Sequence, residues 1–398
     1  MLLLVLSALA ADDPAVLARE AIQAHPGVVA LSAQADALRH TAAISDLWAD
    51  PTVRLEYSNV PLNAPGLGNH PVSGVQLQLV QPLPSPGAMP LREDVADAGV
   101  AIAEQRILVA VRDLEEQVHI GFWRLTLTRE LTELTTRHVQ RADELLDAVR
   151  SRYEVGDSGQ STLLRLEVLR NRLADELLDH AAVEQALVAA LAQTVGRSEF
   201  ETGPLDAVAP TGNPETWLEA AQDHPALVQL RLEAEKAERA ADLAVAEARP
   251  QVSVWAGYRV RTLQADDTDL VSIGLGAPLP RNQGRRSHAG AAACMDQAYA
   301  ARMQEEALLD AFEAELTQAH AAWTRASDRH IHWSTVLVPG GEAALEAALS
   351  DYRVGKAEFS VLYDAEAVLL ELERGLLVAA AETHIQAARV AALTGGGL

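Results

Sequence analysis

The sequence has little of several features that would assign it to a class at once. Among its 398 residues there is one cysteine, Cys294, so the chain forms no internal disulfide and no cysteine zinc site. No thiol lies near the N-terminus to carry a lipid. Aromatic residues make up only 4%, few for a protein built mostly of strands. No apolar run after the N-terminus approaches the roughly 18 residues of a membrane-spanning helix, so any membrane crossing would have to be made by strands.

Positive charge is also scarce. The chain has 32 basic and 56 acidic residues, a formal net charge of -24, and this balance argues against a polyanion such as DNA or RNA as a partner. Alanine, leucine, glutamate and arginine are abundant instead, as in long helices. The composition therefore predicts a mainly helical protein.

The first ten residues, MLLLVLSALA, form a short apolar run that ends in small residues, as a secretory signal segment does before its cleavage site. The basic stretch that usually opens such a segment is missing, so the leader over residues 1–10 looks truncated. We expect export from the cytoplasm.

The rest of the chain is an internal duplication. Matching residues recur at an offset of 199: His25-Pro26 with His224-Pro225, Pro51 with Pro250, and Tyr153-x-Val155-Gly156 with Tyr352-x-Val354-Gly355. A fixed offset held over most of the chain is the signature of a repeat. We predict repeat 1 over residues 11–202, a Gly/Pro-containing linker over 203–213, and repeat 2 over 214–398.

Each repeat shows the same order of elements. In repeat 1 a helical pattern over residues 13–48 ends before Pro51, and two strands with alternating apolar and polar residues follow, around 53–57 and 75–79. Repeat 2 has the same alternation over 252–260 and 271–277. The sequence therefore predicts four amphipathic strands.

Long helices follow the strands. The segment from about residue 89 to 153 contains one proline, Pro90, at its start, and as one helix it would extend about 90 Å. Its apolar positions alternate by four and three residues, as in coiled coils. A second helix over about 161–194 returns, which makes a helical hairpin. In repeat 2 we expect Pro339-Gly340-Gly341 to interrupt the corresponding long helix before its tip.

Such strands cannot remain as a four-stranded sheet in water, because the apolar face has to be buried or placed in lipid. Three chains would supply twelve strands, an even number within the range of outer-membrane barrels. A soluble sandwich packed against helices would also satisfy the alternation. The long hairpins favour the barrel, because strands of about ten residues cannot cover helices of about 90 Å.

The duplicated order of helix, two strands and helical hairpin resembles the TolC-like outer-membrane channel proteins of tripartite efflux and type I secretion systems. The resemblance covers nearly the whole chain after residue 12. It is carried by the His-Pro pairs, the prolines flanking the strands, and the tips RYEVGDSGQSTLLRLEVLRNR and YRVGKAEFSVLYDAEAVLLELE. The stretch DPTVRLEYSNVP is similar to a strand of the heavy-metal and cation efflux members, which implies metal cations among the solutes.

This resemblance implies a homotrimer with a transmembrane β-barrel in the outer membrane and an α-helical barrel in the periplasm. It implies a periplasmic adaptor protein and an inner-membrane pump as partners. The tip residues matching the family motif would contact the adaptor: Val155, Gly156, Val354 and Gly355. The same glycines would also serve as ordinary helix caps.

The resemblance further implies that Asp364 and Tyr352 narrow the periplasmic entrance. Three copies of Asp364 would form a ring of carboxylates that favours cations. The equivalent residue in repeat 1 is Arg165, so Asp364 could instead pair with an arginine of a neighbouring helix, and Tyr352 could be a packing residue. We also expect Pro339, Gly340 and Gly341 to act as a hinge for opening.

Enzymatic function has only the twelve histidines in its favour. No His-x-x-x-His or His-Glu-x-x-His spacing occurs, and neither a phosphate-binding glycine loop nor a nucleophile elbow is present. We expect scattered surface histidines, no metal site, no cofactor and no enzyme. The main alternative to a passive channel is a soluble periplasmic coiled-coil scaffold or adaptor.

Overall fold

The computed structural model describes residues 11–63, 65, 73–154, 159–261, 269–279 and 281–395. The predicted leader and two of the predicted tip residues, Val155 and Gly156, lie outside the described residues.

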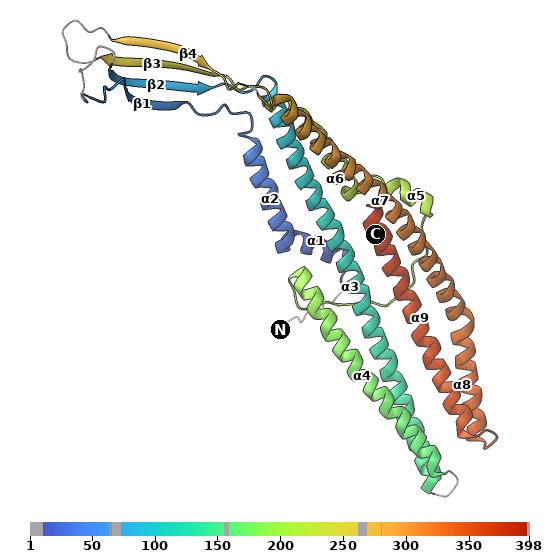
Figure 1. The fold of residues 1–398 in the computed structure, drawn as a ribbon. Helices are drawn as coiled ribbons and strands as arrows, with labels where there is room; N and C mark the ends of the chain where they lie inside the picture. Colours follow the sequence, from blue (N-terminus) through green and yellow to red (C-terminus); the bar gives the residue numbers. More distant parts are fainter. Residues whose placement is uncertain are drawn as a thin grey trace, which may run out of the picture. The chain divides into compact units, whose positions relative to one another are not determined.

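The described chain is mainly helical with four strands, as predicted (Figure 1). The first half contains α1 (Pro14–Ala24), α2 (Pro26–Ala42), β1 (Thr52–Ser58), β2 (Gly74–Pro82), α3 (Ala88–Glu154) and α4 (Gln160–Val195). The second half contains α5 (Pro214–Ala221), α6 (Pro225–Glu247), β3 (Ser253–Arg261), β4 (Leu270–Gly276), α7 (Gln283–His332), the π-helix η1 (Trp333–Leu337), α8 (Val338–Arg353) and α9 (Phe359–Thr394). The two halves therefore repeat the same order of elements, apart from η1.

The first helical stretch of each half is divided in two, which the sequence pattern did not predict. In the first half His25 has extended backbone angles between α1 and α2, and Pro26 begins α2. Proline disfavours helical geometry in the preceding residue and is well accommodated in a first helical turn. His224-Pro225 stands at the same point of the second half, between α5 and α6. The repeated His-Pro pair is therefore a helix junction.

Local signals fix other helix ends. Asp13 caps α1 by accepting a hydrogen bond from the Ala15 amide at 2.9 Å. Asn213 and Thr216 form a reciprocal capping box at the start of α5. Gly196 and Gly395 end α4 and α9 in left-handed conformation, with φ of 88° and 71°. These two glycines are one repeat apart, so the duplication preserves its helix stops.

The chain forms two compact units, and each takes residues from both repeats. We call Met1–Ala30, Ile107–Pro225 and Leu308–Leu398 the helical unit, and Leu31–Arg106 with Ala226–Ala307 the sheet unit. The predicted repeats and the compact units thus divide the chain in different ways.

Clusters of buried apolar side chains hold the helical unit together, and two of them are large. One joins α1, α3 and α4 around Leu17, Val118 and Leu125, which are 1%, 0% and 0% exposed. The other joins α3, α4, α8 and α9, and its members include Val149, Leu166 and Leu362. All four long helical segments near the hairpin ends therefore share one core, as the four-three spacing predicted for coiled-coil packing.

In the sheet unit the four strands are antiparallel in the order β1-β2-β3-β4. The central pair, β2 with β3, joins the two repeats, with Leu77 opposite Tyr258 and Gln76 opposite Arg259. β1 and β4 are the edge strands of this sheet.

Candidate functional site

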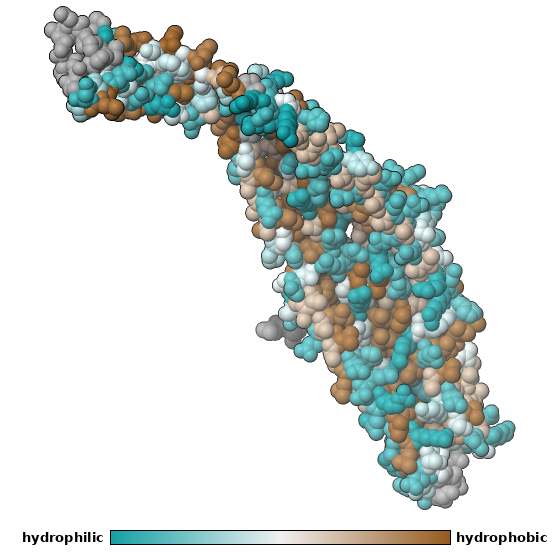
Figure 2. Space-filling model, in the orientation of Figure 1, coloured by the Kyte–Doolittle hydropathy of each residue, from teal (hydrophilic) through white to brown (hydrophobic). Residues whose placement is uncertain are grey.

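The face of the sheet that carries apolar side chains is exposed. Register places Leu55, Leu77, Tyr258 and Val271 in one row, and Val53, Leu79, Ala256 and Ile273 in the next. On the edge strand β4, Val271 is 75% exposed, Ile273 81% and Leu275 75%. Figure 2 shows hydrophobic side chains over these strands. A large exposed apolar surface on one face marks contact with another protein or with lipid.

The opposite face carries polar side chains, and those of β2 and β3 are better covered than the apolar ones. Gln76 is only 9% exposed and accepts a hydrogen bond from Arg259 Nη2 at 2.6 Å. Two glycines make room on this face: a Cβ at Gly257 would lie 2.5 Å from Gln76, and one at Gly274 would lie 2.5 Å from the Trp255 ring. The distribution is the reverse of that of a soluble sheet, which covers its apolar face and exposes its polar face to water.

The described end of the second helical hairpin is a tight turn between α8 and α9. Gly355 has φ of 74°, a conformation that glycine adopts without strain, and the Lys356 amide bonds to the Asp351 carbonyl at 2.8 Å. Val354 beside it is 65% exposed. The turn therefore presents an apolar side chain and a glycine at its end.

Asp364 and Tyr352, the two predicted entrance residues, have different surroundings. Asp364 is exposed on α9, and within the described residues no arginine or lysine forms an ion pair with its carboxylate. Tyr352 is half-buried and packs edge to face on Phe359, with ring centroids 5.9 Å apart. A cleft of about 380 Å³ brings Tyr352 together with Arg165, the repeat-1 counterpart of Asp364. Tyr352 of the second hairpin and Arg165 of the first thus line the same cleft.

The helix interruption predicted at Pro339-Gly340-Gly341 is wrongly placed. These three residues belong to the regular helix α8, and the irregular segment is the π-helix Trp333–Leu337 just before them. Proline has no amide hydrogen, so the carbonyl four residues earlier loses its usual donor. The backbone bond from the Val338 amide to the Trp333 carbonyl spans five residues and takes up the distortion.

Trp333 of this π-helix packs against a notch in α9. A Cβ at Gly375 would lie 1.6 Å from the Trp333 ring, so only glycine allows this approach. The Arg329 guanidinium lies over the same ring at 4.0 Å from its centroid. The π-helix is thereby attached to α9 at one defined point.

Three histidines contradict the expectation of scattered surface positions. His119, His138 and His224 are buried, at 8%, 1% and 9% exposure. His138 lies between two carboxylates of α9: its Nδ1 is 2.7 Å from Glu366 and its Nε2 is 2.6 Å from Glu373. The sequence signal for this cluster is two glutamates seven residues apart on a mostly apolar helix, which puts both on one buried face.

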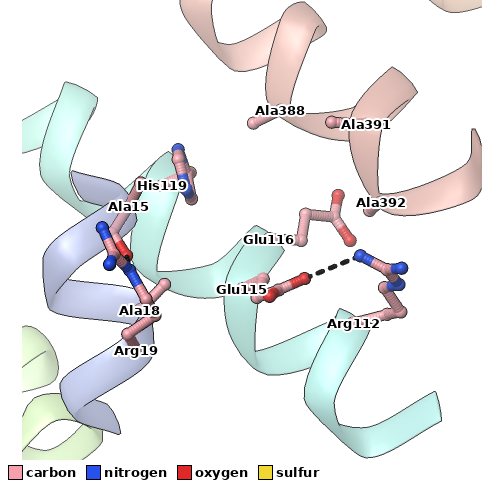
Figure 3. Close-up of a pocket in the computed structure, with 10 residues that line it drawn as sticks. All are labelled: Ala15, Ala18, Arg19, Arg112, Glu115, Glu116, His119, Ala388, Ala391 and Ala392. Atoms are coloured by element: carbon pink, nitrogen blue, oxygen red, sulfur yellow. Dashed lines mark hydrogen bonds and ion pairs between the residues drawn. The ribbon is translucent and has the colours of Figure 1, made fainter. Parts of the chain in front are cut away.

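His119 lines a small pocket between α1, α3 and α9, together with charged residues and alanines (Figure 3). Burial lowers the His119 pKa, and burial together with Glu315 and Asp113 raises the Glu116 pKa despite the charge of Arg389. Glu115 accepts a hydrogen bond from Arg112 at 3.1 Å. The cavity of about 180 Å³ is below the roughly 300–1,000 Å³ of small-molecule sites, so we assign it no ligand.

No group of three or more His, Cys, Asp or Glu side chains in the described ranges is placed to bind a metal ion. Of the helices in the part of the chain that the structure covers, none is both long and apolar enough to span a membrane.

The fold is shared with solved structures. No protein-family model and no curated protein matches the sequence. The structure is similar to the outer-membrane channel OprN, with a TM-score of 0.81 and 16% identity over 96% of this chain and 90% of that one. It is also similar to the outer membrane protein VceC from Vibrio cholerae, with a TM-score of 0.79 and 18% identity over 96% of each chain. The Campylobacter jejuni CmeC outer membrane channel is similar with a TM-score of 0.79 and 14% identity, over 97% of this chain and 86% of that one.

The chain has the fold of outer-membrane channels. This confirms the fold expected from the TolC-like resemblance, over nearly the full length of the chain. At such low identity the likeness is one of fold, and the roles of individual residues have to be argued from this chain.

Proposed function

We propose that this chain is the outer-membrane exit duct of a tripartite efflux or type I secretion system. The observation that carries the proposal is the exposed apolar face of a sheet whose polar face is the better covered one, in a chain with an outer-membrane channel fold. A lipid-facing barrel wall requires this distribution, with apolar residues outside and polar residues toward the lumen.

We propose a homotrimer, because the described part of one chain supplies four strands and pairs neither β1 nor β4 on its outer edge. Three chains make twelve strands and close the barrel without edges. The helices also present apolar residues for neighbouring copies: on α4, Leu164, Val168 and Leu178 are 50%, 58% and 69% exposed. Burying these residues between copies would form a tunnel of helices, which we place in the periplasm.

In this proposal the duct is passive and is not an enzyme, so an inner-membrane pump supplies the energy. The turn at Val354 and Gly355, with the equivalent Val155 and Gly156, meets a periplasmic adaptor protein. Solutes pass the Asp364 carboxylates on entry, which favours cations, metal cations among them.

Negative-stain electron microscopy of the detergent-solubilised protein is the first test. A three-fold particle supports the duct. Compact monomers or dimers that need no detergent would support the alternative, a soluble coiled-coil scaffold.

A matched pair of substitutions on β4 tests the lipid-facing surface. Ile273→Lys puts a charge on the apolar face, whereas Ser272→Lys puts the same charge on the opposite face. We expect Ile273→Lys to lower the stability of the trimer in lipid by about 2–4 kcal/mol and Ser272→Lys to cost much less. The measurement is urea unfolding of the protein in vesicles. An effect of Ile273→Lys no larger than that of Ser272→Lys would mean that the apolar face lies in water, and it would contradict a lipid-facing surface.

Val354→Asp tests the adaptor contact. Burying an unpaired carboxylate in an interface costs at least about 2 kcal/mol, so the affinity of the trimer for its adaptor should fall about thirtyfold or more. Val378→Asp, another exposed valine of the second hairpin, is the control and should leave binding unchanged. Equal effects of the two variants would remove the turn from the adaptor interface.

Asp364→Asn tests the entrance. One unit charge about 4 Å from a passing ion contributes about 1 kcal/mol in water, so the cation-to-anion permeability ratio should fall roughly fivefold or more. The ratio is measured from the reversal potential of single channels in planar bilayers under a salt gradient. Glu346→Gln, which neutralises another exposed carboxylate of the second hairpin, is the control. An unchanged reversal potential for Asp364→Asn would place this residue away from the ion path.

The hinge is tested by Pro339→Ala combined with Gly340→Ala. Alanine restores the missing amide donor and stiffens the helix by up to about 1 kcal/mol at the glycine, where the structure has open space for a methyl group. Gly341 is left in place because its Cβ would lie 3.1 Å from Leu372. We expect trimers in normal yield with reduced efflux, whereas Gly284→Ala in α7 should change neither. Normal efflux in the double variant would make the segment a static kink.

A further inference from the structure

The buried cluster around His138 connects the first helical hairpin with the second. His138 belongs to α3, and both of its carboxylate partners belong to α9, 228 and 235 residues further along the chain. The side chains of His138 and Glu366 are 1% and 5% exposed, and that of Glu373 is 17% exposed. The contact is therefore almost fully screened from water, unlike the exposed ion pairs elsewhere on the helices.

The geometry requires an extra proton. Each ring nitrogen lies within hydrogen-bond distance of a carboxylate oxygen, and a carboxylate only accepts. A neutral imidazole carries a single N–H, so it can satisfy one carboxylate and leaves its lone pair facing the other. The arrangement is complete when the ring is an imidazolium that donates from both nitrogens.

The other charged groups around the cluster do not replace this proton. From α3, Arg141 reaches Glu366 only at 4.0 Å, and Arg137 acts on Glu373 through its charge alone. On α4, His180 and Glu176 have partners of their own: His180 meets Thr135 at 3.3 Å, and Glu176 accepts from Arg374 at 2.6 Å. Loss of the His138 proton would thus leave one of the two carboxylates without a hydrogen-bond donor from the ring, and only the charges of Arg141 and Arg137 would oppose those of the carboxylates.

The cluster lies on a short stretch of α9 that other elements also hold. Within this stretch Arg374 bonds to Glu176 of α4, and Gly375 receives the Trp333 ring of the π-helix. Towards the turn, α9 continues to Asp364 and Phe359. A change at Glu366 and Glu373 therefore acts on the helix segment next to the predicted entrance.

We propose that His138, Glu366 and Glu373 form a proton-dependent clasp between the two hairpins, which holds the end of the second hairpin in place when His138 is charged and releases it when the proton leaves. The clasp is a property of the single chain. Its use as a pH-controlled gate rests on the proposed function.

The sign of the pH dependence follows from the surroundings of the ring. Burial disfavours the charged imidazole, but the hydrogen bonds and charges of Glu366 and Glu373 outweigh burial, and the His138 pKa is raised above its ordinary value of 6.5. The clasp is then complete below pH 6.5 and is lost as the pH rises through the raised pKa. Burial alone would raise the Glu373 pKa, but His138 and two arginines lower it below 4.5, so this carboxylate stays charged throughout that range.

Hydrogen exchange of the purified, detergent-solubilised protein tests the clasp, with variants compared at the same pH. In His138→Gln the amides of residues 352–375 should exchange faster than in the wild type at pH 6.5. At pH 8.5 the variant and the wild type should exchange at similar rates. The expected size follows from the His138 pKa in the held and released states. For each unit by which the pKa is higher in the held state, His138→Gln should exchange about ten times faster than the wild type at low pH. His138→Lys carries a permanent charge with several donors and should stay protected at both pH values.

The controls separate the clasp from general effects. His40→Gln removes an exposed histidine of the sheet unit and should match the wild type at every pH. If His138→Gln does not fold, Glu373→Gln serves instead and should shift the loss of protection to lower pH. A wild type with the same protection at both pH values, or a pH-independent ratio between it and the variant, would overturn the clasp.

Conductance in planar bilayers tests the gate separately. We expect the wild type to conduct more at pH 8.5 than at pH 6.5, and His138→Lys to remain low at both. If exchange depends on pH as described but conductance does not, the clasp stands and its role as a gate is wrong. If no variant conducts at any pH, the proposed channel function is wrong while the exchange result still decides the clasp.

Discussion

A sheet of four strands with one apolar face cannot be completed by the chain that makes it, and this constraint governs the rest of the structure. Backbone donors and acceptors at the open edges of β1 and β4 need partners, and the apolar rows through Leu77 and Ile273 need a medium other than water. Closure by further copies in a membrane satisfies both needs at once. Gly257, beside the Gln76 side chain, and Gly274, opposite Trp255, leave space for these large side chains on the polar face, which would line the lumen of such a barrel.

The helical unit solves a different problem, which is to keep very long helices in register. Apolar side chains from α3, α4, α8 and α9 form a common core, but such a seam tolerates sliding because its residues are similar along its length. Specific contacts at one level of α9 prevent this: the His138 cluster, the Arg374–Glu176 pair and the Trp333–Gly375 notch. Buried polar groups in coiled coils fix register in the same way.

The strands, the long helices and their stops were predictable because each is written in a local pattern. Alternation at Val53, Leu55 and Tyr57 has period two, and the glycine that ends α4 recurs at the end of α9. The pairing of β2 with β3 and the contact of His138 with Glu366 join residues far apart in sequence, which no local pattern encodes. The π-helix was not predicted. A proline in the sequence shows that a helical hydrogen bond is lost, but not which helical turn changes its geometry as a result.

The junction between β2 and β3 also carries information about symmetry. It places the last strand of one repeat beside the first strand of the next, which is the same neighbour relation that β4 of one copy would have with β1 of another. The chain thus contains, within itself, a version of the boundary that a closed ring of three chains requires. Such a ring would have six nearly equivalent strand pairs, β1-β2 and β3-β4 of each chain, and six contacts between neighbouring pairs. Three of these contacts are β2-β3 contacts within one chain, so the duplication links them covalently.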